Sequence, residues 1–455
     1  MNRHRGFALL GGLIAVAALV CAAIFGGFAL LAPGSGPGSD DAKGATSPTS
    51  PTSPTDRTGS TGESSATTPP PGRAAPASAD AWTATWATAP VGVEEGAPQG
   101  YPGRTIRNVV HTSIGGTSAR VTFSNLYGTE ALFIGSASVA VGAEGPGARP
   151  GSLRRLTFSG RPEVTVPPGG QVISDPVALR LPYGGDLLVS LYTPVAGGPV
   201  TYHPYALQTS YFADGDRTAD TTGAPYTEPT RAWRYVTAVD VQNREARGAV
   251  VAFGDSITDG VGSRTDLNHR WPDILAGRLR ERHVGVVNAG IGGNRVLADS
   301  VATRKGASGI DRFPRDVLER AGVRTVVIDL GVNDILRGAE RDPEKITAGL
   351  RELTRQAHTR GLRVIGSTLT PFGAHRGYNM ITESVRNQVN AEIRAGGVFD
   401  DVVDFDQAVR DPYAPHRIRP SYDCGDGLHP SDAGYRAMGN ALDLALLEAK
   451  VPAKL

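Results

Sequence analysis

Cysteine is nearly absent from this sequence, and neither sign of charge prevails. The 455 residues include only Cys21 and Cys424. These two lie in regions that a membrane or a long linker should separate, so they do not support a disulfide framework. The 46 basic side chains are balanced by 45 acidic ones, which gives a formal charge of +1. This balance argues against a nucleic-acid partner.

Charge is missing altogether from residues 6–32, which follow a basic N-terminal stub. As a helix this run would span roughly 40 Å, longer than the roughly 30 Å hydrocarbon core of a bilayer. No small-x-small cleavage site closes the run, and Val20 weakens a lipoprotein interpretation of Cys21. We therefore predict that residues 1–32 form a cytoplasmic stub and an uncleaved signal anchor, rather than a cleaved signal peptide. Either alternative exports the remainder of the chain.

Residues 33–80 lack the apolar side chains that a core requires. They consist mainly of Gly, Ser, Thr and Pro, with a short S-P-T repeat at residues 47–55. Such a composition predicts a disordered spacer. A flexible chain of this length reaches about 40 Å, so the folded part would be held away from the membrane on a tether.

Long helical periodicity is absent from residues 81–245. Short alternating runs punctuated by Gly and Pro predict an antiparallel β-sandwich or jelly roll. Aromatic side chains gather late in this segment, at Tyr202, Tyr205, Tyr211, Tyr226, Trp233 and Tyr235. They could form a sugar-stacking platform that contacts cell-wall glycan. We favour the alternative that they belong to the sandwich core or to its contact with the next domain.

Strands and helices alternate in residues 246–455. Apolar runs predict strands at residues 249–253, 284–288, 325–330, 362–369 and 402–403. Helical periodicity predicts helices that begin near Pro272, Asp342 and Ser431, and another that buries Val385 and Val389. The last of them should bury Tyr435, Met438, Leu442 and Leu446. This order predicts a parallel sheet in a three-layer α/β/α domain.

Ser256 comes directly after the first of these strands, in the stretch A-V-V-A-F-G-D-S-I-T at residues 249–258. Gly254 would allow a tight turn with torsions that a side chain forbids. Ligands of open α/β sheets bind at the carboxyl ends of the strands. Ser256 is therefore a candidate nucleophile, although a serine in this place is also typical of a turn or a helix cap.

Two further loops offer hydrogen-bond donors at the same edge of the sheet. The backbone N–H of Gly293, in Asn-Ala-Gly-Ile-Gly-Gly at residues 288–293, could face a developing oxyanion. The glycine spacing does not fit the G-x-G-x-x-G dinucleotide fingerprint. The amide of Asn333, in Gly-Val-Asn-Asp at residues 331–334, suits an oxyanion equally, unless it caps the following helix in an Asx-turn.

Asp426 and His429 lie three residues apart in one turn before the last helix. The carboxylate can accept a hydrogen bond from one imidazole nitrogen, which leaves the other nitrogen to face a serine. An isolated D-x-x-H also occurs in surface turns and at the edge of metal sites. No second His or Cys lies at a ligand spacing, so we expect neither a metal nor a cofactor.

The four blocks together resemble those of the SGNH hydrolases, also called the GDSL esterase/lipase superfamily. The resemblance covers residues 247–446, and Ile-Thr follows Ser256 where the name-giving pattern has Leu. It implies a flavodoxin-like fold and serine esterase chemistry without metal. It assigns Ser256 as nucleophile, Asp426 and His429 as the rest of the triad, and Gly293 and Asn333, with the Ser256 N–H, as oxyanion donors. The G-x-S-x-G elbow of α/β-hydrolases is missing.

Three stretches together are similar to those of a secreted bacterial branch that includes xylan-associated arylesterases and acetylesterases. They are Arg-Trp-Pro-Asp at residues 270–273, residues 288–297, and Val-Asp-Phe-Asp at residues 403–406. Many such proteins carry a β-sandwich ahead of the hydrolase domain. This resemblance implies a short acyl group on a carbohydrate, and we expect a small-molecule or polysaccharide ester as substrate. We keep two alternatives: a lipase, which the missing apolar lid disfavours, and a surface glycan-binding protein that uses the hydrolase domain as a scaffold.

Overall fold

The computed structural model describes residues 82–299 and 306–447. The predicted signal anchor over residues 1–32 and the predicted spacer over residues 33–80 lie outside these ranges, so both stay predictions. Within the described ranges, no helix combines the length and the apolar character needed to cross a bilayer. All described residues fall into one compact unit of the chain.

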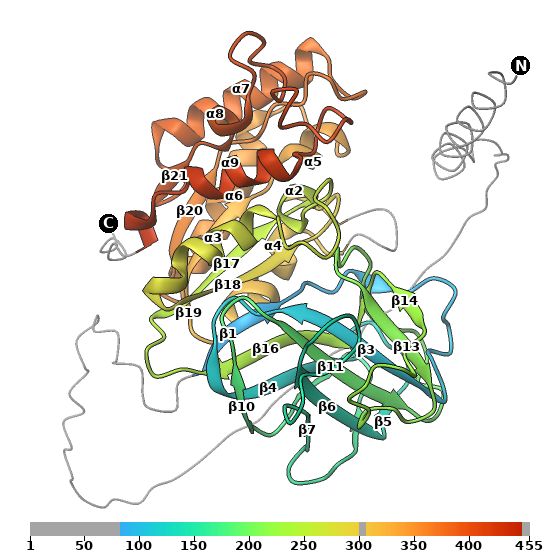
Figure 1. Ribbon diagram of the computed structural model, residues 1–455. Helices are drawn as coiled ribbons and strands as arrows, with labels where there is room; N and C mark the ends of the chain where they lie inside the picture. Colours follow the sequence, from blue (N-terminus) through green and yellow to red (C-terminus); the bar gives the residue numbers. More distant parts are fainter. Residues whose placement is uncertain (1–81, 300–305, 448–455) are drawn as a thin grey trace, which may run out of the picture. The chain divides into compact units, whose positions relative to one another are not determined.

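The described chain up to Gln242 contains strands as its only regular elements. One antiparallel sheet has the order β1 (Trp82–Ala87), β16 (Val236–Gln242), β4 (Gly116–Ser124) and β10 (Val177–Leu181), with β9 (Gln171–Ile173) paired to β4. A second large sheet has the order β14 (Glu228–Thr230), β13 (Ser210–Asp214), β3 (Arg104–His111), β11 (Asp186–Thr193), β6 (Ser136–Val141) and β7 (Arg154–Arg155). Side chains of both sheets share one buried core. The prediction of a β-rich N-terminal region is therefore confirmed (Figure 1).

Four of the six clustered aromatic side chains are buried. They are Tyr202, Tyr226, Trp233 and Tyr235, and the Trp233 ring packs edge-on against Trp86. Tyr202, Trp233 and Tyr235 belong to the core that the two sheets share, which fits the interpretation that we favoured. Tyr205 differs, because 59% of its surface is exposed.

The C-terminal sheet is parallel and has the strand order of flavodoxin-like folds. That order is β18 (Val284–Gly290), β17 (Gly248–Gly254), β19 (Val323–Asp329), β20 (Arg363–Ser367) and β21 (Asp401–Val403). One group of packed helices contains α3 (Trp271–Leu279), α8 (Phe405–Val409) and α9 (Asp432–Ala441). The other contains α4 (Gly309–Phe313), α6 (Pro343–His358) and α7 (Met380–Ala395). The sheet lies between the two groups, so the three-layer α/β/α prediction is confirmed (Figure 1).

Capping explains where several of these helices begin and end. The Asp342 side chain accepts from the backbone N–H of Glu344 and starts α6, as predicted. Ser431 caps α9 in the same manner. The prediction that Leu446 belongs to this last helix is wrong. Leu442 adopts an extended conformation that ends α9, and Leu446 lies in a separate short 3-10 helix at Leu444–Leu447.

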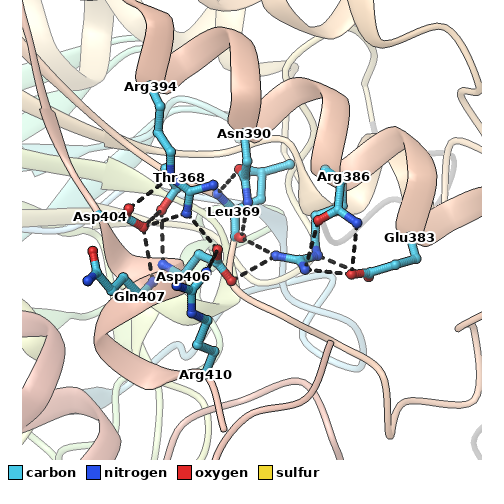
Figure 2. A network of polar contacts seen from close by, with 11 residues as sticks. Thr368, Leu369, Glu383, Arg386, Asn390, Arg394, Asp404, Asp406, Gln407 and Arg410 are labelled. Atoms are coloured by element: carbon cyan, nitrogen blue, oxygen red, sulfur yellow. Dashed lines mark hydrogen bonds and ion pairs between the residues drawn. The ribbon is translucent and has the colours of Figure 1, made fainter. Parts of the chain in front are cut away.

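Charged side chains join the far edge of the sheet to α7 and α8, as Figure 2 shows. The buried carboxylate of Asp406 accepts hydrogen bonds from Arg386 at 2.9 Å and from Arg394 at 2.6 Å. Asp404 accepts from Arg394 and from the Thr368 hydroxyl, both at 2.8 Å. The Val-Asp-Phe-Asp stretch therefore stabilises the scaffold through paired charges.

The β-rich region and the α/β region share buried surface. Ala84 and Ala87 of β1 belong to the same core cluster as Val251 of β17. The backbone N–H of Ala84 donates to Ala321 at 2.9 Å, and the N–H of Val286 donates to the Ser113 hydroxyl at 2.9 Å. The chain passes from one region to the other between β16 and β17. Our division into domains at residues 81–245 and 246–455 stays a prediction, and the two parts pack as one body.

A buried ion pair connects the two regions. His203, from β12 (Thr201–His203), lies 3.0 Å from the Asp259 carboxylate through Nε2, and its Nδ1 lies 2.9 Å from the Ala89 carbonyl oxygen. Burial by itself lowers the pKa of His203, but the Asp259 carboxylate and the Ala89 carbonyl outweigh burial and raise it. The protonated imidazole therefore stabilises the contact between the regions.

We expect His203→Gln to lower the free energy of unfolding by about 3 kcal/mol, because it leaves the Asp259 charge buried without its partner. A raised histidine pKa stabilises the folded state fully below the unfolded value of about 6.5, and this contribution is lost as pH rises through the folded value. In urea unfolding, the difference in the free energy of unfolding between wild type and variant should therefore be larger at pH 6 than at pH 9. A difference that does not change with pH would contradict this assignment.

Candidate active site

Ser256 follows the interior strand β17 and begins a short helix, α2 (Ser256–Asp259). The Asp255 side chain caps this helix by accepting from the Ile257 N–H at 2.9 Å. Gly254 is required here for space and not for unusual torsions, which corrects our sequence argument. Its backbone is not left-handed, and a Cβ atom at this position would lie 2.2 Å from the Thr258 hydroxyl oxygen.

His429 and Asp426 meet Ser256 from the loop before α9. The Nε2 atom of His429 lies 2.8 Å from the Ser256 hydroxyl oxygen, and its Nδ1 atom lies 2.6 Å from Asp426 Oδ2. Asp426 also accepts the backbone N–H groups of Leu428 at 2.9 Å and His429 at 2.8 Å. Burial alone would raise the pKa of Asp426, but the hydrogen bonds from His429 hold it well below its usual range. The aspartate is therefore an ionised acceptor that fixes the Nδ1–H tautomer.

Gly293 lies in the loop after β18, and the end of β18 packs against α2. A Cβ atom at Gly290 would lie 2.2 Å from the Asp259 amide nitrogen, so only glycine permits the approach. Gly293 itself has a φ of 76°, which favours glycine. Among the described residues, the amides of Gly293 and Ser256 have no acceptor. Both donors are thus available for a ligand.

Asn333 lies in the first turn of α5 (Val332–Leu336). Its Oδ1 atom accepts from Arg337 Nε at 3.0 Å, and its Nδ2 atom donates to Asp255 Oδ2 at 3.0 Å. Arginine only donates, so this contact fixes which end of the amide carries the hydrogens. The side chain does not cap α5, which removes the Asx-turn alternative. One Nδ2 hydrogen is left over for a ligand.

Buried acidic side chains that the motif argument did not use support these groups. Asp334 accepts the N–H groups of Val296 at 2.8 Å and Leu297 at 3.0 Å, and so fixes the chain that follows Gly293. Burial raises the pKa of Asp334 to about 6. Asp329, at the end of β19, accepts from the Thr258 hydroxyl at 2.9 Å. This bond holds α2 against the end of the sheet. A lone acidic residue at the end of an apolar strand was the signal that could have identified Asp329.

The acidic loop around Asp426 does not suit a metal ion. Atoms of Asp423, Cys424 and Asp426 lie within 4.8 Å of one another. The Asp426 carboxylate is engaged by His429, and Asp423 accepts the backbone N–H groups of two neighbouring glycines. Burial and the Asp426 charge raise the pKa of Cys424 to about 11, so this thiol stays protonated at neutral pH and is a poor ligand or nucleophile.

Comparison with known proteins agrees with the blocks in the sequence. Residues 252–437 match the model of the GDSL-like lipase/acylhydrolase family. No curated protein gave a match. Est24, a carbohydrate acetylesterase from Sinorhizobium meliloti, is 20% identical over 43% of this chain and 96% of its own, with a TM-score of 0.37. The native aryl esterase of M. smegmatis is 21% identical over 43% of this chain and 95% of its own, with a TM-score of 0.34.

A GDSL-like lipase from Bacteroides thetaiotaomicron is 20% identical over 44% of this chain and 88% of its own, with a TM-score of 0.33. The family match extends from the end of β17 into α9, and so includes Ser256, Gly293, Asn333, Asp426 and His429. The α/β region of this chain therefore belongs to the GDSL-like lipase/acylhydrolase family within the SGNH hydrolases, and the protein is a carboxylic ester hydrolase.

Proposed function

We propose that the protein is a serine esterase in which Ser256, His429 and Asp426 form the catalytic triad. The observation that carries this proposal is the continuous chain of hydrogen bonds from Asp426 through His429 to the Ser256 hydroxyl. The backbone N–H groups of Ser256 and Gly293 and the amide of Asn333 supply the oxyanion hole. Each of these groups lies at an element boundary on the carboxyl edge of the sheet.

In the acylation step, His429 Nε2 takes the proton from the Ser256 hydroxyl as the oxygen attacks the ester carbonyl carbon. The tetrahedral intermediate places its negative oxygen toward the three donors. Collapse of the intermediate breaks the bond to the alcohol, which leaves with the proton from His429. The acyl group stays on Ser256 as an ester.

In the deacylation step, His429 removes a proton from a water molecule that attacks the acyl-enzyme, and the same donors hold the second oxyanion. The proton then returns to the Ser256 oxygen as the carboxylic acid leaves. Asp426 orients the imidazole and stabilises its charged form in both steps without being protonated itself.

For the substrate we propose esters of short acyl chains such as acetyl, carried on carbohydrate. The sequence has no long apolar lid segment between the catalytic blocks, which would cover an extended acyl chain. We further propose that the enzyme acts outside the cytoplasm, on the tether that residues 1–80 predict. A lipase is the competing assignment, and it differs in the acyl chain length that it prefers.

A series of p-nitrophenyl esters from acetyl to palmitoyl tests this assignment. We expect kcat/KM to be highest for acetyl and to fall steadily as the chain lengthens, because no apolar channel repays the cost of desolvating a long chain. Mass spectrometry of the protein after reaction with a phosphonate ester should find the label on Ser256. Faster turnover of palmitoyl than of acetyl esters would replace the proposal by the lipase assignment.

A further inference from the structure

The connection between β12 and β13, residues 204–209, brings the β-rich region to the active site. It follows His203, which pairs with Asp259 at the end of the helix that Ser256 begins. It carries Tyr205, the one residue of the late aromatic group that is classed as exposed. The chain thus places an uncovered aromatic ring close to the nucleophile helix.

The loop is fixed at both of its ends. Its Ala206 N–H donates to the Arg231 carbonyl at 3.1 Å, and its Leu207 carbonyl accepts from the Asp266 N–H at 3.0 Å. The Asp266 carboxylate accepts from the N–H of Thr209 at 2.5 Å and from its hydroxyl at 2.7 Å. Because Asp266 belongs to the α/β region, these bonds hold the loop in place against the catalytic domain.

Tyr205 lies against the oxyanion loop. Its Cδ2 atom is 3.8 Å from the place that a Cβ atom on Gly292 would occupy. Gly292 directly precedes Gly293, whose N–H is one of the proposed oxyanion donors. The exposed ring of Tyr205 is therefore positioned beside the proposed oxyanion hole.

We propose that Tyr205 is a specificity-determining residue, and that it stacks on a ring in the alcohol part of the ester. The inference rests on the proposed function. If the acyl group is as small as acetyl, the alcohol is the only part of the substrate large enough to reach the Tyr205 ring. The ring is exposed, and the hydrogen bonds of Ala206 and Thr209 fix its loop, so its flat face is available to a ring in the alcohol.

The chemistry that Tyr205 recognises is the flat face of a ring, which sugars and aryl groups share. An exposed tyrosine ring offers an apolar face for stacking and a hydroxyl for hydrogen bonding. Stacking of this kind changes KM more than kcat when it acts equally on the substrate and the transition state.

The test compares Tyr205→Leu with Tyr205→Phe, since leucine keeps the bulk without the ring and phenylalanine keeps the ring without the hydroxyl. We expect Tyr205→Leu to raise KM for ring-bearing acetates roughly three- to tenfold, the range of one aromatic contact, while Tyr205→Phe restores it. Comparing phenyl acetate with an acetylated xyloside shows whether the ring that Tyr205 recognises is an aryl group or a sugar. Vinyl acetate, which has no ring, should be hydrolysed equally by all three proteins.

Three outcomes would overturn the inference: unchanged KM for both ring-bearing acetates, an equal loss on vinyl acetate, or an effect that follows a ring in the acyl group of methyl phenylacetate instead. These outcomes are distinct from failure of the proposed function. That function fails if wild-type turnover of phenyl acetate does not depend on Ser256. The inference fails alone if Ser256-dependent turnover is intact and the Tyr205 variants match wild type.

Discussion

Ser256→Ala is expected to lower kcat for p-nitrophenyl acetate by roughly 10⁵- to 10⁶-fold, as loss of the nucleophile does in triad hydrolases. Alanine has no oxygen to form the acyl-enzyme, and the His429 Nε2 atom, 2.8 Å from the hydroxyl in the wild type, loses its partner. The residual rate should come from substrate binding and the oxyanion donors alone. The rate of p-nitrophenolate release, followed in a stopped-flow or a steady-state assay, measures the loss of kcat.

The matched control is Ser384→Ala, which removes an exposed hydroxyl on α7 that accepts only from Gln388. This control should keep wild-type turnover. Both variants should keep the wild-type thermal midpoint within a few degrees, because neither loses a buried apolar contact. Retention of more than a hundredth of the wild-type activity by Ser256→Ala would show that another residue is the nucleophile.

Asn333→Ala should reduce kcat by roughly 10²- to 10³-fold with little change in KM, because an oxyanion donor acts mainly on the transition state. Asn333→Asp should be slower still. It keeps the size of the side chain, but it turns a carboxyl oxygen toward Asp255 Oδ2, which lies 3.0 Å from Asn333 Nδ2 in the wild type. The same oxygen would repel the developing oxyanion.

Steady-state kinetics of the two Asn333 variants with one short ester measures this ranking. Arg337→Leu serves as the comparison, since it removes only the donor to Asn333 Oδ1 and leaves the Nδ2 group in place. We expect Arg337→Leu to lower kcat much less than Asn333→Ala does. If Asn333→Ala raises KM and leaves kcat alone, the amide binds the ground state and is not an oxyanion donor.

The parallel sheet and the spacing of the site residues could be predicted from the sequence, because both depend on local patterns. An apolar run such as residues 249–253 is typical of a strand buried on both faces. The neighbouring carboxyl ends of parallel strands meet at one edge, which is why Ser256 and Asn333 were expected to come together. Their placement follows that expectation, and their chemical roles stay a proposal.

The polar support of the site could not be predicted, since it depends on contacts between distant residues. The bonds of Asp334 to the backbone of Val296 and Leu297 join two loops that no periodicity relates. The pair of His203 with Asp259 spans the two regions of the chain. Nothing in the sequence relates these side chains to their partners, and only the folded chain brings them together.

The position of β1 constrains the order in which the molecule can assemble. In its sheet this strand pairs with β16 alone, which lies some 150 residues further along the chain. During synthesis, β1 must therefore wait, unpaired and largely apolar, until residue 242 has left the ribosome. β1 also packs beside β18 of the following region. We expect slow, concerted folding of a high-contact-order chain, with a vulnerable strand edge until β16 pairs with β1.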